Sequence, residues 1–224
     1  MPFLISISLC ALIKREKMNL KKATILLIVG SAYTLCHKAI FAIFPFLPNN
    51  LVVHNILTPL WLLATLTIIL FAFYFPKEVT PIKKQIRISL KLVILFTSII
   101  ILLKLPFVQS LIPRIQRNTF FEFSRLSNSI AMLVFWFSFY KIVSNKYQLH
   151  NSLKLVIWAE CVGVLLGLIS LGYHINFIFT GIENIPFPPL KFLAVIVFVI
   201  SYFALINFLI KFKKVDDYKK LVLS

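Results

Sequence analysis

The sequence predicts an all-α integral membrane protein: a six-helix transmembrane bundle with both termini on the cytoplasmic side. The chain of 224 residues is 60% hydrophobic. Its apolar residues fall into runs of about twenty, the length that spans the hydrocarbon core of a bilayer. Stretches such as 92–103 and 192–209 are apolar all round, whereas a helix of a soluble domain has one polar face. The 24 Lys and Arg residues gather between these runs.

Each expected span must be a helix, because lipid offers no hydrogen-bonding partner to the backbone. The expected spans are residues 23–45, 51–76, 88–112, 123–144, 151–174 and 190–211. Residues 1–22 form a basic cytoplasmic segment and residues 212–224 a basic cytoplasmic tail, so one transmembrane domain, 23–211, lies between them. A Pro-Phe pair recurs in each outer connection: Pro45-Phe46, Pro106-Phe107 and Pro186-Phe187. It reflects either a repeat of three helical hairpins or only the frequency of Pro and Phe at helix ends.

The apolar stretch 2–13 is too short to span a membrane. It also lacks the basic start and small-residue cleavage site of a signal peptide. Two interpretations stay open. The segment lies in the membrane interface as a short helix, or the natural protein starts at Met18 and residues 1–17 are a non-native extension.

Positive charge gives the expected orientation. Eighteen of the 24 cations lie before the first span, around the second and fourth connections, and after the sixth span. Cytoplasmic loops are enriched in Lys and Arg, which places these segments inside. The expected location is the cell membrane, as a multi-pass protein of the bacterial inner membrane, with anionic lipid headgroups as partners. Nucleic acid is not expected, because the cations flank apolar segments instead of sharing a soluble face.

The outer halves of the spans hold polar and basic side chains where this rule expects few. The residues are His37, Lys38, His54, Lys104, Arg125, Asn128, His174 and Lys191. They either converge on an outward-facing pocket for an anionic small molecule or lipid, or extend separately to headgroups. Lys38 and Lys104 favour the pocket, because each has apolar chain on both sides.

Glu160 lies near the middle of the fifth span and is the one acid well inside an expected helix. An ionised group there costs about 2.5–3.5 kcal/mol on insertion scales, so it needs a partner or a purpose. One interpretation is an interhelical ion pair with Lys91 or Lys38, or a protonated acid bonded to a neighbour. The other is a role in proton transfer or ligand binding.

Ala159, Gly163 and Gly167 form a small-residue face beside Glu160. Small residues at this spacing let two helices approach closely. We expect this face to pack against another helix, within the chain or in a membrane protein partner.

No motif points to metal or cofactor chemistry, so neither is expected. HExxH, DxxxD, GxSxG and a Gly-rich phosphate loop are absent, and these are the patterns that place such groups together. The three cysteines, Cys10, Cys36 and Cys161, are isolated, which excludes the spacings of metal sites and disulfide frameworks.

One nucleophilic arrangement is chemically able to catalyse acyl transfer. Cys36, Arg125 and His174 all fall in the outer half, and a thiolate beside an imidazole is a reactive pair. Their order is similar to that in exosortase-like membrane transpeptidases. The segment around Cys36 lacks the small residues and glycine of such a site, so no catalytic residue is assigned.

The expected function is therefore non-enzymatic: binding or transport of an anionic small molecule or lipid from the outer side. The alternative is a membrane-embedded sensor or assembly subunit of a larger complex, favoured by the small-residue face and the short connections. An acyl-transfer enzyme is the third and most remote alternative.

Overall fold

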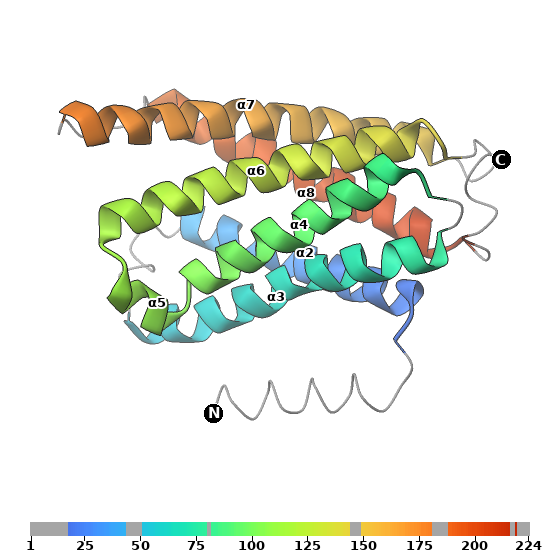
Figure 1. The fold of residues 1–224 in the computed structure, drawn as a ribbon, viewed down its shortest axis with the longest axis horizontal. Helices are drawn as coiled ribbons and strands as arrows, with labels where there is room; N and C mark the ends of the chain where they lie inside the picture. Colours follow the sequence, from blue (N-terminus) through green and yellow to red (C-terminus); the bar gives the residue numbers. More distant parts are fainter. Residues whose placement is uncertain are drawn as a thin grey trace.

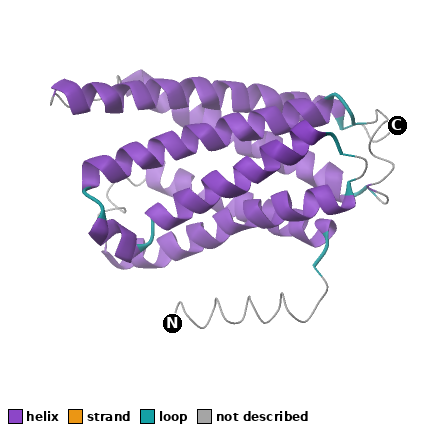
Figure 2. Ribbon diagram, in the orientation of Figure 1, coloured by secondary structure: helices purple, strands orange, loops and turns teal. Residues whose placement is uncertain are grey.

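The structure is a computed structural model that describes residues 18–43, 51–79, 82–143, 149–180, 188–215 and Tyr218. These residues form seven α-helices and no β-strand (Figures 1 and 2). The helices are α2 (Leu20–Ile43), α3 (Leu51–Glu78), α4 (Lys84–Leu103), α5 (Pro106–Leu111), α6 (Arg114–Tyr140), α7 (His150–Thr180) and α8 (Pro188–Lys213). Residues 1–17, on which two interpretations were left open, lie outside the described part, as does most of the tail.

Five helices, α2, α3, α4, α7 and α8, are long and apolar enough to cross a membrane. This confirms an all-α protein with membrane-like helices. Helix α6 is similarly long, with 27 residues, but it is not among the five. Its first half carries Arg117, Glu122 and Arg125, which break the apolar run.

Three expected helix bounds were wrong. Helix α4 ends at Leu103 rather than at 112, and α5 starts separately at Pro106, because proline lacks a backbone N–H and clashes with the preceding turn. Helix α6 begins at Arg114 rather than at 123. Helix α7 continues to Thr180 rather than ending at 174. Apolar runs mark what lipid covers, whereas helical hydrogen bonding continues through polar residues.

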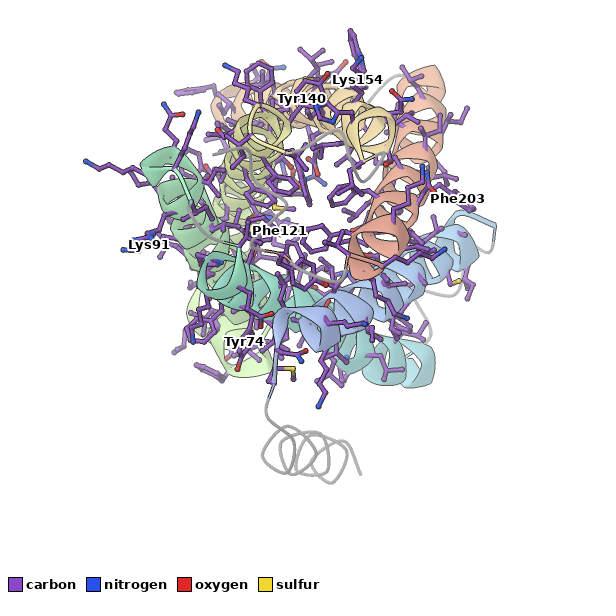
Figure 3. The ribbon with its side chains drawn as sticks, turned by 90° about the vertical axis from the view of Figure 1, so that its right-hand side faces the viewer. Tyr74, Lys91, Phe121, Tyr140, Lys154 and Phe203 are labelled. Atoms are coloured by element: carbon purple, nitrogen blue, oxygen red, sulfur yellow. The ribbon has the colours of Figure 1, made fainter. Side chains whose placement is uncertain are left out.

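The six long helices form a closed ring. Each packs against its neighbours in sequence, and α8 completes the ring by packing against α2. Figure 3 looks along the bundle and shows this order around a central axis. The contacts occur between the expected hairpins as well as within them, so every helix has two neighbours and one face turned toward the axis.

Helices α2 and α3 approach each other closely at Gly30. A Cβ at this position would lie 2.5 Å from Oγ1 of Thr67 and 2.9 Å from the carbonyl oxygen of Ala64. Tyr33, one turn further along α2, donates a hydrogen bond from its hydroxyl to the carbonyl oxygen of Leu57 at 3.1 Å. Glycine is therefore required where these two backbones meet.

Large aromatic side chains fill the centre of the ring at one end, which we call the aromatic end. This end holds the C-termini of α3, α6 and α8 and lies on the right in Figure 1. We call the side chains the aromatic plug: Phe71, Phe75, Phe135, Trp136, Phe139, Phe208, Phe212 and Tyr218, all buried.

The plug is built from helices that are not neighbours in the ring. The ring centroids of Phe75 and Phe135, from α3 and α6, are 5.0 Å apart, and those of Phe75 and Phe212, from α3 and α8, are 5.9 Å apart. Trp136 and Phe208 are 5.2 Å apart. The side chains therefore meet across the axis and close the interior at this end. The opposite end, where α4 ends and α6 begins, is called the polar end.

Candidate functional site

Lys38 is positioned by the inward face of α2. Residues that alternate four and three apart lie on one face of a helix. On α2 this series is buried from the aromatic end upward: Leu20, Thr24, Leu27, Ser31 and Thr34. Lys38 is the next member of the series, and it is exposed. Lys38 therefore points into the ring, at a level where protein no longer covers the inward face.

Lys104 occupies the equivalent position on α4. The buried series there is Ile86, Leu90, Val93, Thr97 and Ile100, and Lys104 is the next member, directly after the helix ends. Its Nζ atom lies 4.3 Å from the ring centroid of Phe121 on α6, a favourable cation–π distance. The charges of Arg117 and Glu122, both on α6, also act on Lys104.

The two lysines share one electrostatic environment with Arg125 and Glu122. The charge of Lys38 interacts with those of Arg125, Lys104 and Glu122. Helix α2 packs against α3 and α8, so these interactions reach across the interior to α6 and to the end of α4. The structure thus brings together three of the residues singled out from the sequence, Lys38, Lys104 and Arg125, around an acid that the sequence analysis missed.

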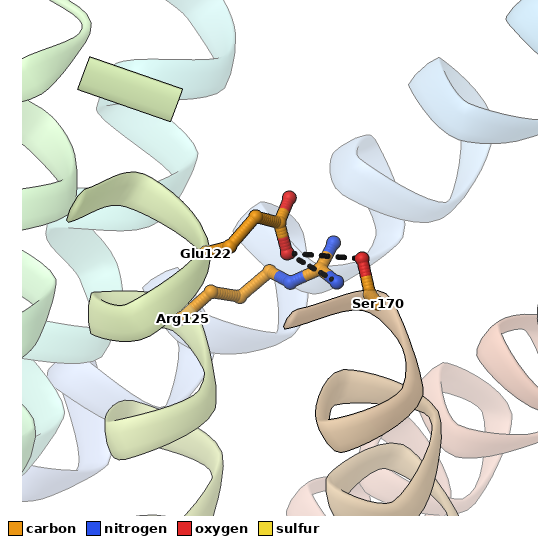
Figure 4. A network of polar contacts seen from close by, with 3 residues as sticks. All are labelled: Glu122, Arg125 and Ser170. Carbon is orange, nitrogen blue, oxygen red and sulfur yellow. Dashed lines mark hydrogen bonds and ion pairs between the residues drawn. The ribbon is translucent and has the colours of Figure 1, made fainter. Parts of the chain in front are cut away.

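Glu122 joins α6 to α7. Its Oε2 atom lies 2.8 Å from Nη2 of Arg125 and accepts a hydrogen bond from Oγ of Ser170 at 3.4 Å (Figure 4). The Glu122 side chain is 17% exposed and that of Arg125 is 49% exposed, so the guanidinium remains accessible beside its partner. Lys38, Lys104 and Arg125 each interact electrostatically with Glu122, and we call these four residues the basic cluster. Three cations share one carboxylate, so the cluster carries an excess of positive charge.

Arg117 has a structural task at the polar end. Its Nη1 atom donates a hydrogen bond to the carbonyl oxygen of Gln109 at 2.7 Å. Gln109 in turn donates from Nε2 to the carbonyl oxygen of Lys104 at 3.0 Å. These bonds attach α5 to both flanking helices and fix the backbone of Lys104 at the polar end of the ring.

The remaining polar residues are distributed around this cluster. Asn128 accepts a hydrogen bond at Oδ1 from Oγ1 of Thr97 at 3.2 Å, which links α6 to α4. His174 follows Ser170 by one turn on the same face of α7. His37 is half-buried on α2, and its ring centroid is 5.9 Å from that of Tyr33. His54 and Lys191 belong to α3 and α8, but their side chains lie outside the described part of the structure.

Glu160 lies on the inward face of α7, one turn from the buried Val156. Its carboxylate acts electrostatically on the hydroxyl of Tyr202 from α8. Within the described residues it forms no ion pair with Lys38 or Lys91. Lys91 is exposed on the outside of the ring (Figure 3), and α4 is not a neighbour of α7.

The small-residue face of α7 has different surroundings at its three positions. Ala159 is buried. A Cβ at Gly167 would lie 3.1 Å from Cδ1 of Leu126 on α6, whereas a Cβ at Gly163 would meet no described atom within 4 Å. Helix packing thus involves Gly167, while Gly163 borders open space. The closer glycine contact, at Gly30, was not identified from the sequence.

Cys36 is separated from the basic cluster. It precedes Lys38 by two residues, which places it about 200° around the helix from Lys38. Cys36 is exposed and lies away from the inward face that carries the charges. The arrangement of Cys36, Arg125 and His174 considered above is therefore not assembled around the interior.

Glu122 and Ser170 were missed because the expected fourth span began at 123 and Ser170 is an ordinary residue in an apolar helix. A signal for Glu122 did exist: it precedes Arg125 by three residues, the spacing of an ion pair on one helix face.

No protein-family model, curated protein or solved structure matches the chain. The geometry of the site is therefore the basis for a proposed function.

Proposed function

We propose that all six long helices span the cell membrane, with α6 as the sixth span and the polar end outside. The aromatic end carries most of the described cations, among them Lys77, Lys83, Lys84, Arg87 and Lys213. This distribution supports the N-in, C-in orientation, because cytoplasmic segments are rich in Lys and Arg. The polar half of α6 is compatible with a span since its charges share the interior with Lys38 and Ser170.

At the polar end, we infer, the protein binds an anionic group, a phosphate or carboxylate, of a small molecule or lipid from the outer side. The supporting observation is the basic cluster itself: Lys38 interacts with Lys104 and Arg125, and all three cations interact with Glu122. Cations held within a membrane domain are costly unless they are paired. A bound anion supplies the missing negative charge.

The parts of the cluster have distinct tasks in this proposal. Lys38 and Lys104 follow the buried residues on the inward faces of α2 and α4, and each supplies a compact point charge. Arg125 is held by Glu122 through one Nη atom, which leaves the other donors of its planar guanidinium for a bidentate contact. Binding of this kind requires no covalent step, in keeping with the position of Cys36 away from the cluster.

The test is binding of radiolabelled inorganic phosphate to the protein in nanodiscs of neutral lipid. The Lys38→Met variant keeps the length of the side chain and removes its charge. We expect it to weaken binding about tenfold or more, because a charged hydrogen bond contributes roughly 1.5–3 kcal/mol. Lys91→Met, on the outside of the ring at the other end, is the matched control and should bind normally. Equal affinities for both variants would refute the proposal.

A second arm separates a free anion from a lipid headgroup. The same proteins are extracted from membranes that contain phosphatidylglycerol, and the lipids that stay bound are counted by native mass spectrometry. A lipid ligand predicts retained phosphatidylglycerol in the Lys91→Met control and its loss in Lys38→Met. A free anion predicts phosphate binding without this difference in retained lipid.

A further inference from the structure

A row of small and polar residues, which we call the polar lane, continues along α7 from the basic cluster toward the middle of the ring. The residues on its inward face alternate four and three apart: Glu160, Gly163, Gly167, Ser170 and His174. Ser170 contacts Glu122 of the basic cluster. Glu160 lies ten residues below it, a rise of about 15 Å. The positions between the two levels on this face are glycines, and the side chain of Leu126 from α6 packs against the upper one, Gly167.

Space exists along this lane. At Gly163, one turn above Glu160, an added Cβ would meet no described atom within 4 Å. Below Glu160 the interior closes, since Val156 on the same face is buried, and Trp136 and Phe208 of the aromatic plug meet across the axis. The interior is therefore closed below Glu160, has open space directly above it at Gly163, and narrows at Gly167, where Leu126 packs against α7.

Glu160 and Tyr202 stand at the closed end of the lane without polar partners. The charge of Glu160 acts on the Tyr202 hydroxyl, and among the described residues neither side chain forms a hydrogen bond or ion pair. Both residues are of intermediate exposure. A carboxylate with a phenol within reach of its charge forms a site for a cationic group. Tyr202, whose ring also contacts Phe198, adds an aromatic surface on which an ammonium is stabilised.

We propose that the interior of the ring is a two-level binding site for a molecule that carries an anionic group and, at a distance, an amine. The basic cluster holds the anionic group at the polar end, and Glu160 with Tyr202 holds the ammonium at the closed end. The inference rests on the proposed function, because the upper level is the anion site described above. It adds a second recognition element, which binds an amine, and so predicts that the ligand is zwitterionic.

The probes are two homologous series: ω-aminoalkyl phosphates of increasing chain length and alkyl phosphates of matched length that lack the amine. Affinities for the full-length protein in neutral nanodiscs are measured by native mass spectrometry or calorimetry. We expect the amine to improve affinity about tenfold or more, since it forms charge-assisted bonds, but only once the chain is long enough to join the two levels. Short aminoalkyl phosphates should bind like their amine-free counterparts.

Two conservative variants locate the effect. Glu160→Gln keeps the shape of the side chain and should abolish the advantage of the amine while leaving the affinity for alkyl phosphates unchanged. Tyr202→Phe should reduce that advantage partially. Both variants are compared with Lys91→Met, which lies outside the ring and should retain the full advantage.

The possible failures are distinguishable. If both series bind equally at every chain length, or if Glu160→Gln preserves the advantage of the amine, the two-level site is wrong and the anion site stands. If no phosphate compound and no inorganic phosphate binds, the anion site fails, and the two-level site fails with it.

Discussion

Two chemically identical substitutions, Gly30→Ala and Gly163→Ala, should have opposite effects on stability. Both replace glycine inside a long helix. At Gly30 the new Cβ would stand 2.5 Å from Oγ1 of Thr67 and 2.9 Å from the carbonyl oxygen of Ala64. Thr67 cannot rotate away freely, because its hydroxyl donates to that same carbonyl oxygen at 2.6 Å. Relief therefore requires α2 and α3 to separate.

The magnitude follows from two opposing terms. Overpacking a close contact costs about 1–3 kcal/mol, and a backbone atom among the clashing partners places Gly30 at the upper end. Alanine regains about 1 kcal/mol of helix propensity over glycine. The free energy of unfolding should therefore fall by about 2 kcal/mol for Gly30→Ala. At Gly163, where an added Cβ would meet no described atom within 4 Å, only the propensity gain of up to about 1 kcal/mol remains.

The assay is reversible unfolding in mixed micelles by titration with a denaturing detergent, followed by circular dichroism. Gly167→Ala provides an intermediate case, since its Cβ would lie 3.1 Å from the flexible Cδ1 end of Leu126. The expected order of stability is Gly163→Ala, then Gly167→Ala, then Gly30→Ala. Equal destabilisation at Gly30 and Gly163 would refute the close approach of α2 and α3 and the open space beside α7.

Two further predictions concern the aromatic end. Phe75→Ala removes a fully buried side chain at the centre of the plug and should lower the free energy of unfolding by about 3–5 kcal/mol, measured by the same titration. Phe203→Ala, on the outside of the ring and 62% exposed, should change little, and a similar loss for both would contradict the plug. Burial, and then the charge of Glu78, raise the pKa of Tyr218 to about 12 from its ordinary value of 10.0. Between pH 10 and about 12 the folded protein therefore keeps this hydroxyl neutral while the unfolded chain ionises. The resulting contribution to the free energy of unfolding is complete below pH 10 and is lost as the pH rises to about 12. Stability should accordingly fall less steeply over this interval in Tyr218→Phe than in the unaltered protein, and identical slopes would speak against burial of the hydroxyl.

Part of the candidate site can be read from the sequence. Lys38 and Lys104 each continue a series of residues four and three apart along their helix, and the same spacing connects Glu160 with Ser170 and His174. Helical periodicity is a local property of the chain, so it determines which residues share a face. It does not determine which way that face points, because an all-apolar helix has no polar side to orient it.

The sequence by itself determined an all-helical chain with membrane-length apolar segments and cations gathered at their ends, because these properties depend on side-chain type and local spacing. Only the tertiary structure decided the closed ring, since the packing of α8 against α2 joins segments from opposite ends of the chain. It also decided that Glu122 reaches Ser170 on α7, and that the charge of Glu160 acts on Tyr202 of α8 while Glu160 forms no ion pair with a described lysine. The physical reason is that partners across an interior are selected by which helices become neighbours, and close contacts such as the one at Gly30 select the neighbours.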